Sequence, residues 1–449
     1  MFGTVSLFSV YLLLVCFSLG LTRVKANGRF RYELTPLTAL VFFSFLYNSA
    51  KPVSILFFDS PVTPLVEPFI FGNILAALGS LGGIAFYQAV HGRFKSSGTH
   101  YFPIKNNLIS MMPLCLVLGA ALGTFAWNRY VMLDYNITNI FSAYGYEGGI
   151  GESNVFQVLS GQFGISAALY GFTVCYLRNR FNKRSTYVWL GICLSIAAFF
   201  LIRGSRNFAI MTVLPIAAIL MYGRSIPVIK SLIIVSISFV AFQFLAYARN
   251  FGVNDLSAMS GLEVRDFAPD NSELVTSFNV YTLYDQIGHY YEMKYGQTYT
   301  VDALVNLVPR FLWRNRPYSI SEDFTRVYLN SDVVNEGFGF SPMVEAIINF
   351  GFWGIPFVFF VAGYFICFLS SLLVKRGSYT SLLSWAMIIP FVINWNRIDF
   401  STTSKMYLIF VSLFGIYDIV STKYLLKEKR ASPAFNSEMR VAARSFVNS

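Results

Sequence analysis

The sequence predicts an all-α polytopic integral membrane protein with about 11 transmembrane helices and one large external loop. Three observations support this class: the composition, the recurrence of apolar runs of helix length, and the alternation of charge between them. Hydrophobic residues make up 55% of the chain and charged residues 13%, and the mean hydropathy is +0.54. Soluble chains carry about 25% charged residues, so this chain lacks the polar surface that solubility requires.

Each predicted span is a run of mostly apolar residues, of which about 20 are needed to cross a membrane. The run at 36–58 contains Lys51-Pro52 and is the weakest prediction. The first run is not preceded by basic residues, so we expect a retained helix and not a cleaved signal peptide. The predicted spans are 4–21, 36–58, 68–90, 108–127, 155–177, 187–202, 208–222, 228–247, 352–374, 382–395 and 406–420.

The distribution of charge predicts how these helices are oriented, because cytoplasmic loops are enriched in Lys and Arg. Basic residues follow the odd-numbered runs, and acidic residues dominate the even-numbered connections. The amino terminus is therefore predicted outside and the carboxyl terminus inside. The basic groups are Arg23 to Arg31, Arg93 to Lys105, Arg178 to Arg184, Arg224 with Lys230, Lys375 with Arg376, and Lys423 to Arg444.

Four segments follow from this topology. Residues 1–248 hold helices one to eight, 249–340 form the large external loop with short helices, 341–422 hold helices nine to eleven, and 423–449 form a basic cytoplasmic tail. The net charge of +11 resides mostly in the cytoplasmic segments, so it does not indicate a nucleic-acid partner. All five cysteines lie in apolar runs, which indicates neither a disulfide framework nor a metal site.

The first candidate site is Arg203-Gly-Ser-Arg206, in the short external connection between the sixth and seventh runs. Two arginines on an external loop oppose the positive-inside bias, and guanidinium groups suit phosphate oxygens. The alternative is a pair of arginines that reach lipid headgroups.

The second candidate is Val308-Pro-Arg310-Phe-Leu-Trp-Arg314-Asn-Arg316-Pro317. A short helix between the two prolines would place Arg310 and Arg314 on one face, with the aromatic side chains in the membrane interface. The alternatives are an interfacial helix that binds only headgroups, or arginines paired with acids of the loop.

The third candidate is Ser341-Pro-Met-Val-Glu345, with Asn349 one turn later. Ser followed by Pro is typical of a helix start. A half-buried carboxylate there would have a raised pKa and would suit a general base, although acids are also common at helix amino ends. His289 is the second candidate base. Arg249, Asn396, Arg397 and Asp399 lie at external helix ends and are expected to line the same site.

Across these three motifs, the chain resembles the Wzy-type O-antigen polymerases, a family that joins oligosaccharide repeat units. The resemblance covers the topology of the whole chain and the three motifs. It implies an enzyme of the bacterial inner (cytoplasmic) membrane with a large periplasmic loop, acting on repeat units linked to undecaprenyl pyrophosphate. It also implies a partner that regulates polysaccharide chain length.

The resemblance implies a mechanism in which a sugar hydroxyl attacks the anomeric carbon of the growing chain and displaces undecaprenyl pyrophosphate. Glu345, or secondarily His289, would accept the hydroxyl proton. Arg203 and Arg206 would hold the pyrophosphate, and Arg310, Arg314 and Arg316 would position the second carrier or its glycan. No nucleotide or metal motif occurs in the sequence, so neither cofactor is expected.

Three alternatives remain open. An O-antigen ligase has a similar topology and uses the same donor, but transfers the glycan to lipid A core. A lipid-linked oligosaccharide transporter (flippase) would show repeats and charges near the membrane midplane, whereas these charges cluster at external helix ends. A non-catalytic assembly partner would tolerate the loss of any single charged residue.

Overall fold

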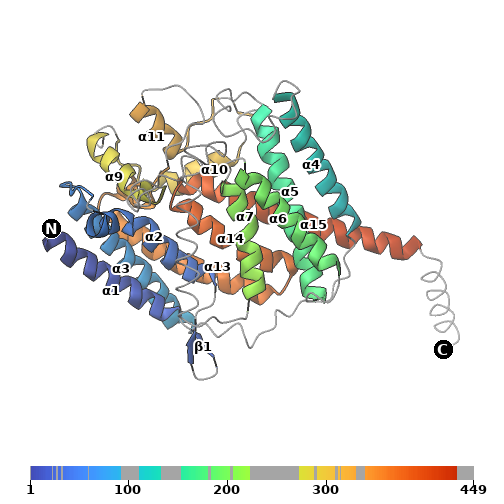
Figure 1. Cartoon of the computed structure of the whole chain (residues 1–449), viewed down its shortest axis with the longest axis horizontal. Helices are drawn as coiled ribbons and strands as arrows, with labels where there is room; N and C mark the ends of the chain where they lie inside the picture. Colours follow the sequence, from blue (N-terminus) through green and yellow to red (C-terminus); the bar gives the residue numbers. More distant parts are fainter. Residues whose placement is uncertain are drawn as a thin grey trace, which may run out of the picture.

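The computed structural model describes residues 2–22, 24–26, 29–31, 34–58, 60–92, 111–132, 153–179, 184–202, 206–222, 273–287, 291–308, 312–313, 315–329 and 339–431. Long helices form a bundle, with the short helices α9, α10 and α11 towards its upper side and β1 at its lower side (Figure 1). The longer helices are α1 Phe2–Leu21, α2 Pro36–Phe57, α3 Val66–His91, α4 Met112–Met132, α5 Ser153–Asn179, α6 Arg184–Ile202, α7 Arg206–Met221, α13 Gly354–Arg376, α14 Tyr379–Trp395 and α15 Phe400–Ala431. The shorter elements are β1 Val24–Ala26, β2 Arg29–Arg31, η7 Glu273–Val275, α9 Thr276–Ile287, η9 Gln297–Tyr299, α10 Val301–Leu307, α11 Ile320–Leu329 and α12 Pro342–Phe350.

The structure confirms a helical protein of the multi-pass membrane class. Within the described ranges, six helices are long and apolar enough to cross a membrane by length and composition: α1, α2, α3, α6, α13 and α15. Three shorter apolar helical segments of 10–17 residues lie in α4 (Met112–Trp127), α7 (Asn207–Met221) and α14 (Tyr379–Trp395). The predicted run at 155–177 is the helix α5, which buries the polar side chains Gln162, Ser166 and Thr173. The predicted span at 228–247 lies outside the described residues.

The weakest predicted span, 36–58, is a continuous helix despite Lys51 and Pro52. Thr35 accepts a hydrogen bond from the Thr38 N–H at 3.1 Å, and Pro36 occupies the first helical position, so the amino end is well capped. The Lys51 side chain is 7% exposed, and its ammonium lies 5.7 Å from the centre of the Phe278 ring.

A short β-hairpin was not anticipated by the prediction of helices alone. β1 and β2 pair antiparallel, with Val24 opposite Arg31 and Ala26 opposite Arg29. The two residues between the strands are Asn27-Gly28, the sequence that favours the tightest hairpin turns. This local signal was present in the sequence and was missed.

Contacts between helices fix their relative directions. Thr4 bonds Glu67 at one end of α1 and α3, and Gln88 bonds the Leu21 carbonyl at the other, so these two helices run parallel. Contacts between α3 and α13 likewise follow the same order along both helices, so these two helices run parallel. Contacts of α14 with α7 and with α15 follow opposite orders along the two helices, so α14 runs antiparallel to both. The beginnings of α7, α12, α13 and α15 therefore lie at the same end of the bundle as the end of α14.

The closest helix pair is α3 with α13. A Cβ on Gly79 would overlap the Pro356 carbonyl, and one on Gly83 would overlap the Phe360 carbonyl. Small residues allow two membrane helices to approach at the backbone, where dispersion contacts replace the hydrophobic effect that is absent in lipid. The pair anchors α12 and the start of α13, from which the candidate site is built.

Candidate functional site

Glu345 is fully buried where three segments meet. It lies on α12, its Oε1 accepts a hydrogen bond from Thr298 Oγ1 at 2.9 Å, and its Oε2 accepts one from the Phe400 N–H at 3.0 Å. Thr298 belongs to η9 in the loop, and Phe400 begins α15. The prediction of a helix that starts at Ser341-Pro342 is confirmed. The predicted half-exposed carboxylate is instead a wholly enclosed one.

Asn349, on the next turn of α12, reinforces the meeting point of the three segments around Glu345, which are η9, α12 and the start of α15; we call this meeting point the junction. Its Oδ1 accepts hydrogen bonds from the N–H groups of Gly296 at 3.0 Å and Thr298 at 3.4 Å, and its Nδ2 donates to Thr298 Oγ1 at 2.7 Å. Gly296 has a φ of 85°, in the left-handed region. A single amide thus holds the turn that carries Thr298, so the contacts of Asn349 in this structure position the loop.

A second buried carboxylate, Asp399, lies beside Glu345 at the start of α15. Its oxygens accept hydrogen bonds from Ser321, from Ser401 Oγ at 2.6 Å, and from the Thr402 N–H at 2.7 Å. The bond from the Thr402 N–H is that of a helix N-cap. Asn306 of α10 donates to Ser401 Oγ at 3.1 Å, so Asp399 connects α15 with two helices of the loop.

These two carboxylates differ in environment. Burial first, and the negative charge of Asp399 second, raise the pKa of Glu345 to about 8, while the hydrogen bonds from Phe400 and Thr298 oppose the shift. At pH 7 Glu345 is therefore mostly protonated. The pKa of the Tyr299 phenol is also raised well above its usual range by burial and by Glu345.

Arg316 is buried within the loop, at 5% exposure. Its guanidinium Nη1 donates to the carbonyl oxygens of Asn306 at 2.8 Å and Val308 at 3.0 Å, which are the end of α10. A cation at a helix carboxyl end satisfies carbonyls that have no partner within the helix. The contacts of Arg316 therefore hold the loop in shape.

The predicted helix between Pro309 and Pro317 is wrong for the described part of that stretch. α10 ends at Leu307, and residues 312–313 and 315–319 form turns and irregular chain. Val308 has φ −75° and ψ 121°, because a residue that precedes proline is excluded from the helical region. Arg310 and Arg314 lie outside the described residues, as do Arg203, Arg249 and His289.

Arg397 connects this junction to the predicted arginine motif. It lies between α14 and α15, its Nη1 donates to Asn207 Oδ1 at 2.9 Å, and its carbonyl accepts from the Phe340 N–H at 2.5 Å. Asn207 directly follows Arg206, whose backbone begins α7. Sequences near positions 206, 340 and 397 thus meet at one place.

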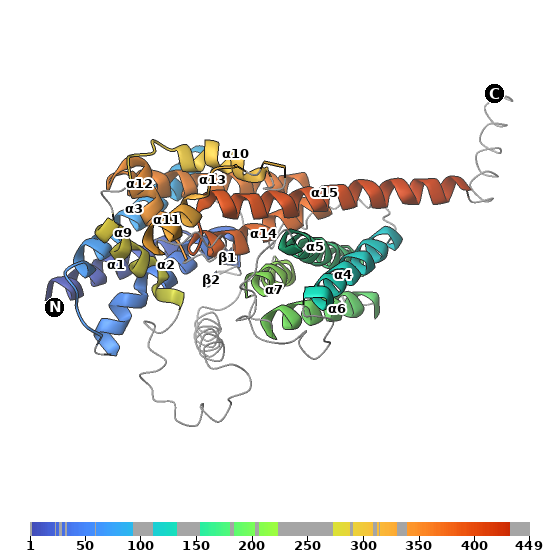
Figure 2. The ribbon, with the colours of Figure 1, turned by 90° about the horizontal axis from the view of Figure 1, so that it is seen from above.

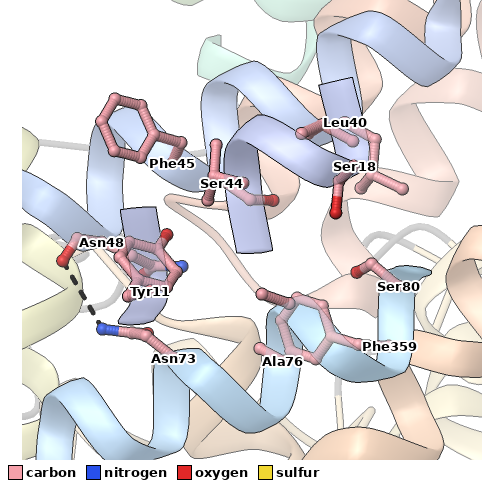
Figure 3. A pocket seen from close by; sticks show the side chains of 13 residues that line it. Tyr11, Ser18, Leu40, Ser44, Phe45, Asn48, Asn73, Ala76, Ser80 and Phe359 are labelled. Atoms are coloured by element: carbon pink, nitrogen blue, oxygen red, sulfur yellow. Dashed lines mark hydrogen bonds between the residues drawn. The ribbon is translucent and has the colours of Figure 1, made fainter. Parts of the chain in front are cut away.

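A small internal cavity lies apart from this junction, between α1, α2 and α3, with Phe359 of α13 on its wall (Figure 3). Its polar lining includes Tyr11, Asn48 and Asn73, and Asn73 donates to the Asn48 carbonyl at 3.5 Å. The cavity measures about 20 Å³, which accommodates about one water molecule. It is therefore too small for a sugar or a headgroup.

Asn48 also connects the cavity to the junction. Its Oδ1 accepts a hydrogen bond from Ser277 of α9 at 3.0 Å, and Ser277 shares one of 2.9 Å with Ser341 at the start of α12. A buried polar chain therefore runs from inside the helices to the segment that carries Glu345.

Sequence reasoning missed the hydroxyl partners of the two carboxylates. Asp399 followed by Ser401 and Thr402 is a recognisable helix-start pattern and could have been found. Thr298 carries no local signal, because its partner lies 47 positions away. Among the described residues, no group of three or more His, Cys, Asp or Glu side chains is arranged to hold a metal ion.

Comparison with family models, with curated proteins and with solved structures found no match for this chain.

Proposed function

We propose that this chain is a membrane glycosyltransferase that polymerises undecaprenyl-pyrophosphate-linked repeat units into O-antigen or a related surface polysaccharide. It would act on the periplasmic face of the bacterial inner membrane, without a metal. One observation carries the proposal: described residues within or next to all three sequence motifs contact the connection between α14 and α15 or the first residues of α15. Glu345 bonds Phe400, Arg397 bonds the residue after Arg206, and Asn306, held by Arg316, bonds Ser401.

The proposed topology has eleven spans, with the amino terminus in the periplasm and the carboxyl terminus in the cytoplasm. The helix directions support it, since the junction lies at one end and the basic residues Lys375 and Arg376 end α13 at the other. By the positive-inside rule, the junction then faces the periplasm.

In the proposed reaction, a sugar hydroxyl of the incoming unit forms a bond to the anomeric carbon of the growing chain. The bond from that carbon to the pyrophosphate oxygen breaks, and undecaprenyl pyrophosphate leaves with its electron pair. Arg203 and Arg206, with Arg397, neutralise the departing charge. The hydroxyl proton passes to Glu345, whose pKa of about 8 suits a base that works near neutral pH.

Access to Glu345 requires η9 to move, because Thr298 and Phe400 occupy both carboxylate oxygens in the closed arrangement. Since only the ionised form accepts a proton, we expect the initial rate of polymerisation to rise with pH up to about 8 and then to level off. A rate that falls over this interval would exclude Glu345 as the base and leave His289 as the second candidate.

The deciding assay supplies purified protein in detergent with the lipid-linked repeat unit and no nucleotide or metal. We expect a product ladder spaced by one repeat unit, abolished in Arg206→Ala and in Glu345→Gln. Arg184→Ala is the matched control, because Arg184 is an exposed arginine that begins α6 at the opposite end of the bundle. Equal ladders in all variants would disprove the site.

The same assay separates the alternatives. Transfer of label to lipid A core, without a ladder, would identify a ligase. Movement of the intact lipid across liposomes, without either product, would identify a transporter. A chain-length regulator is a further proposed partner, and it would change the length of the ladder without being required for its appearance.

A further inference from the structure

Helix α10 is amphipathic, but its apolar face is exposed and its polar face is buried. A helix at a water-exposed surface has the opposite arrangement. Val301 and Leu304 are 54% and 68% exposed, and Leu307 lies on the same side. Asn306, the polar side chain opposite them, is buried and bonds Ser401 and Thr402 of α15. In water, such a helix would turn its leucines inward. The environment that favours this arrangement is apolar.

The exposed apolar surface extends on both sides of α10. Before it lie Met293 and Tyr295, and after it lie Leu312 and Trp313, all exposed. These side chains belong to the loop, outside the six candidate spans. Soluble surfaces rarely carry so many large apolar side chains in one stretch, and such patches indicate a binding partner or a membrane.

This surface is continuous with the exposed apolar side of the candidate span α13. Met293 Cε lies 3.7 Å from the position that a Cβ would take on Gly351, two residues before the 73%-exposed Trp353. The Tyr299 ring stacks on Phe350, which in turn meets the exposed Phe357 of α13 edge to face. In Figure 2, α10 lies at the margin of the bundle, beside the beginning of α15 that it contacts.

We propose that α10 and its flanking residues 293–295 and 312–313 are seated in the membrane, with Val301, Leu304 and Leu307 in contact with the acyl chains of the leaflet nearest the junction. Trp313, Tyr295 and Trp353 lie at the depth of the headgroups, where aromatic side chains are preferred. This inference depends on the candidate spans and not on the proposed reaction.

The consequence is that an embedded α10 fixes the depth of the loop relative to the membrane. Asn306 connects α10 to α15, and Thr298 connects η9 to α12. Arg316 bonds the end of α10 and holds that part of the loop together. An embedded α10 therefore holds the two buried carboxylates at the membrane boundary, within reach of a ligand that is itself anchored in the bilayer.

The experiment places a fluorescent thiol label at single positions of a full-length variant whose five native cysteines are replaced by alanine. Leu304→Cys is the test position, Gln286→Cys on α9 is the aqueous control, and Phe357→Cys on α13 is the lipid control; all three native residues are exposed. The labelled proteins are reconstituted in phosphatidylcholine–phosphatidylglycerol vesicles. Quenching is measured with iodide and with a lipid spin-labelled near its headgroup.

We expect the label at 304 to be quenched by the spin-labelled lipid and to be several-fold less accessible to iodide than the label at 286. Quenching by iodide as strong as at 286 would overturn the proposal, because the face would then be in water. Protection from both quenchers would also overturn it, because the face would then be covered by protein, such as a second copy of the chain.

Discussion

At the scale of single residues, the central group of the junction is the buried carboxyl group of Glu345. Glu345 has no exposed surface, and its two oxygens accept hydrogen bonds from a hydroxyl and a backbone N–H. Asp399 lies beside it with a richer set of donors: three hydroxyls and a backbone N–H. Because like charges repel, the negative charge of Asp399 favours the neutral form of Glu345.

The raised pKa of Glu345 predicts how stability depends on pH. The folded protein holds a proton on Glu345 that the unfolded chain releases, so stability is greatest below the ordinary value of 4.5 and declines as pH rises towards about 8. The decline from this one group is at most about 1.4 kcal/mol per pH unit. Melting temperatures in detergent between pH 5.5 and 9 measure it.

Glu345→Gln removes this titration and serves as the matched variant. Below about pH 8, we expect the melting temperature of this variant to change less with pH than that of the parent protein, because glutamine stays neutral throughout. Identical pH profiles for both proteins would show that Glu345 does not titrate in the folded state in this range.

At the scale of elements, Asp399 starts α15 and fastens the loop to it. Asp399→Ala removes a helix cap, worth about 1 kcal/mol, and leaves Ser321 and Ser401 without their acceptor, which adds roughly 1–3 kcal/mol for each buried donor. We therefore expect a melting temperature several degrees lower, with earlier proteolysis in the loop. Asp285→Ala, at an exposed position of α9, is the control and should behave like the parent protein.

The elements also show what the sequence could and could not predict. Long apolar helices were predictable because hydropathy and length are local properties. The segment predicted at 36–58 is such a helix despite Lys51-Pro52. The helix predicted between Pro309 and Pro317 is wrong for residues 312–313 and 315–317, because arginines that would share a face of a helix do not by themselves favour one. The pairing of Glu345 with Thr298 and Phe400 was unpredictable, because it depends on how three separated segments pack.

At the scale of the whole molecule, the helix directions and the basic residues make one orientation testable. We expect Asp285→Cys to react with a membrane-impermeant thiol reagent in intact spheroplasts. Arg184→Cys, at the other end of the bundle, should react only after the membrane is permeabilised. Each substitution is made in the variant without native cysteines. The reverse result would invert the topology and move the junction to the cytoplasmic face.

The contact between α3 and α13 gives a second prediction at this scale. Gly83→Leu places a side chain against the Phe360 backbone and should force the two helices apart, so the yield of monodisperse protein in detergent should fall severely. Gly119→Leu on α4 is the control, because nothing lies within 4 Å of a Cβ there. Equal yields for both variants would mean that the close approach does not hold the bundle together.

The pairing of α3 with α13 also governs when the protein can finish folding. α3 ends at His91 and α13 begins at Gly354, so most of the chain is synthesised between them. At about 10 residues per second, α3 waits for roughly half a minute in the membrane before its partner emerges. During this interval its glycine-lined face is open to wrong neighbours and to quality-control proteases. In a chain truncated before residue 354, the glycine-lined face of α3 is never covered by α13. Degradation of such a chain therefore needs no signal other than this uncovered face.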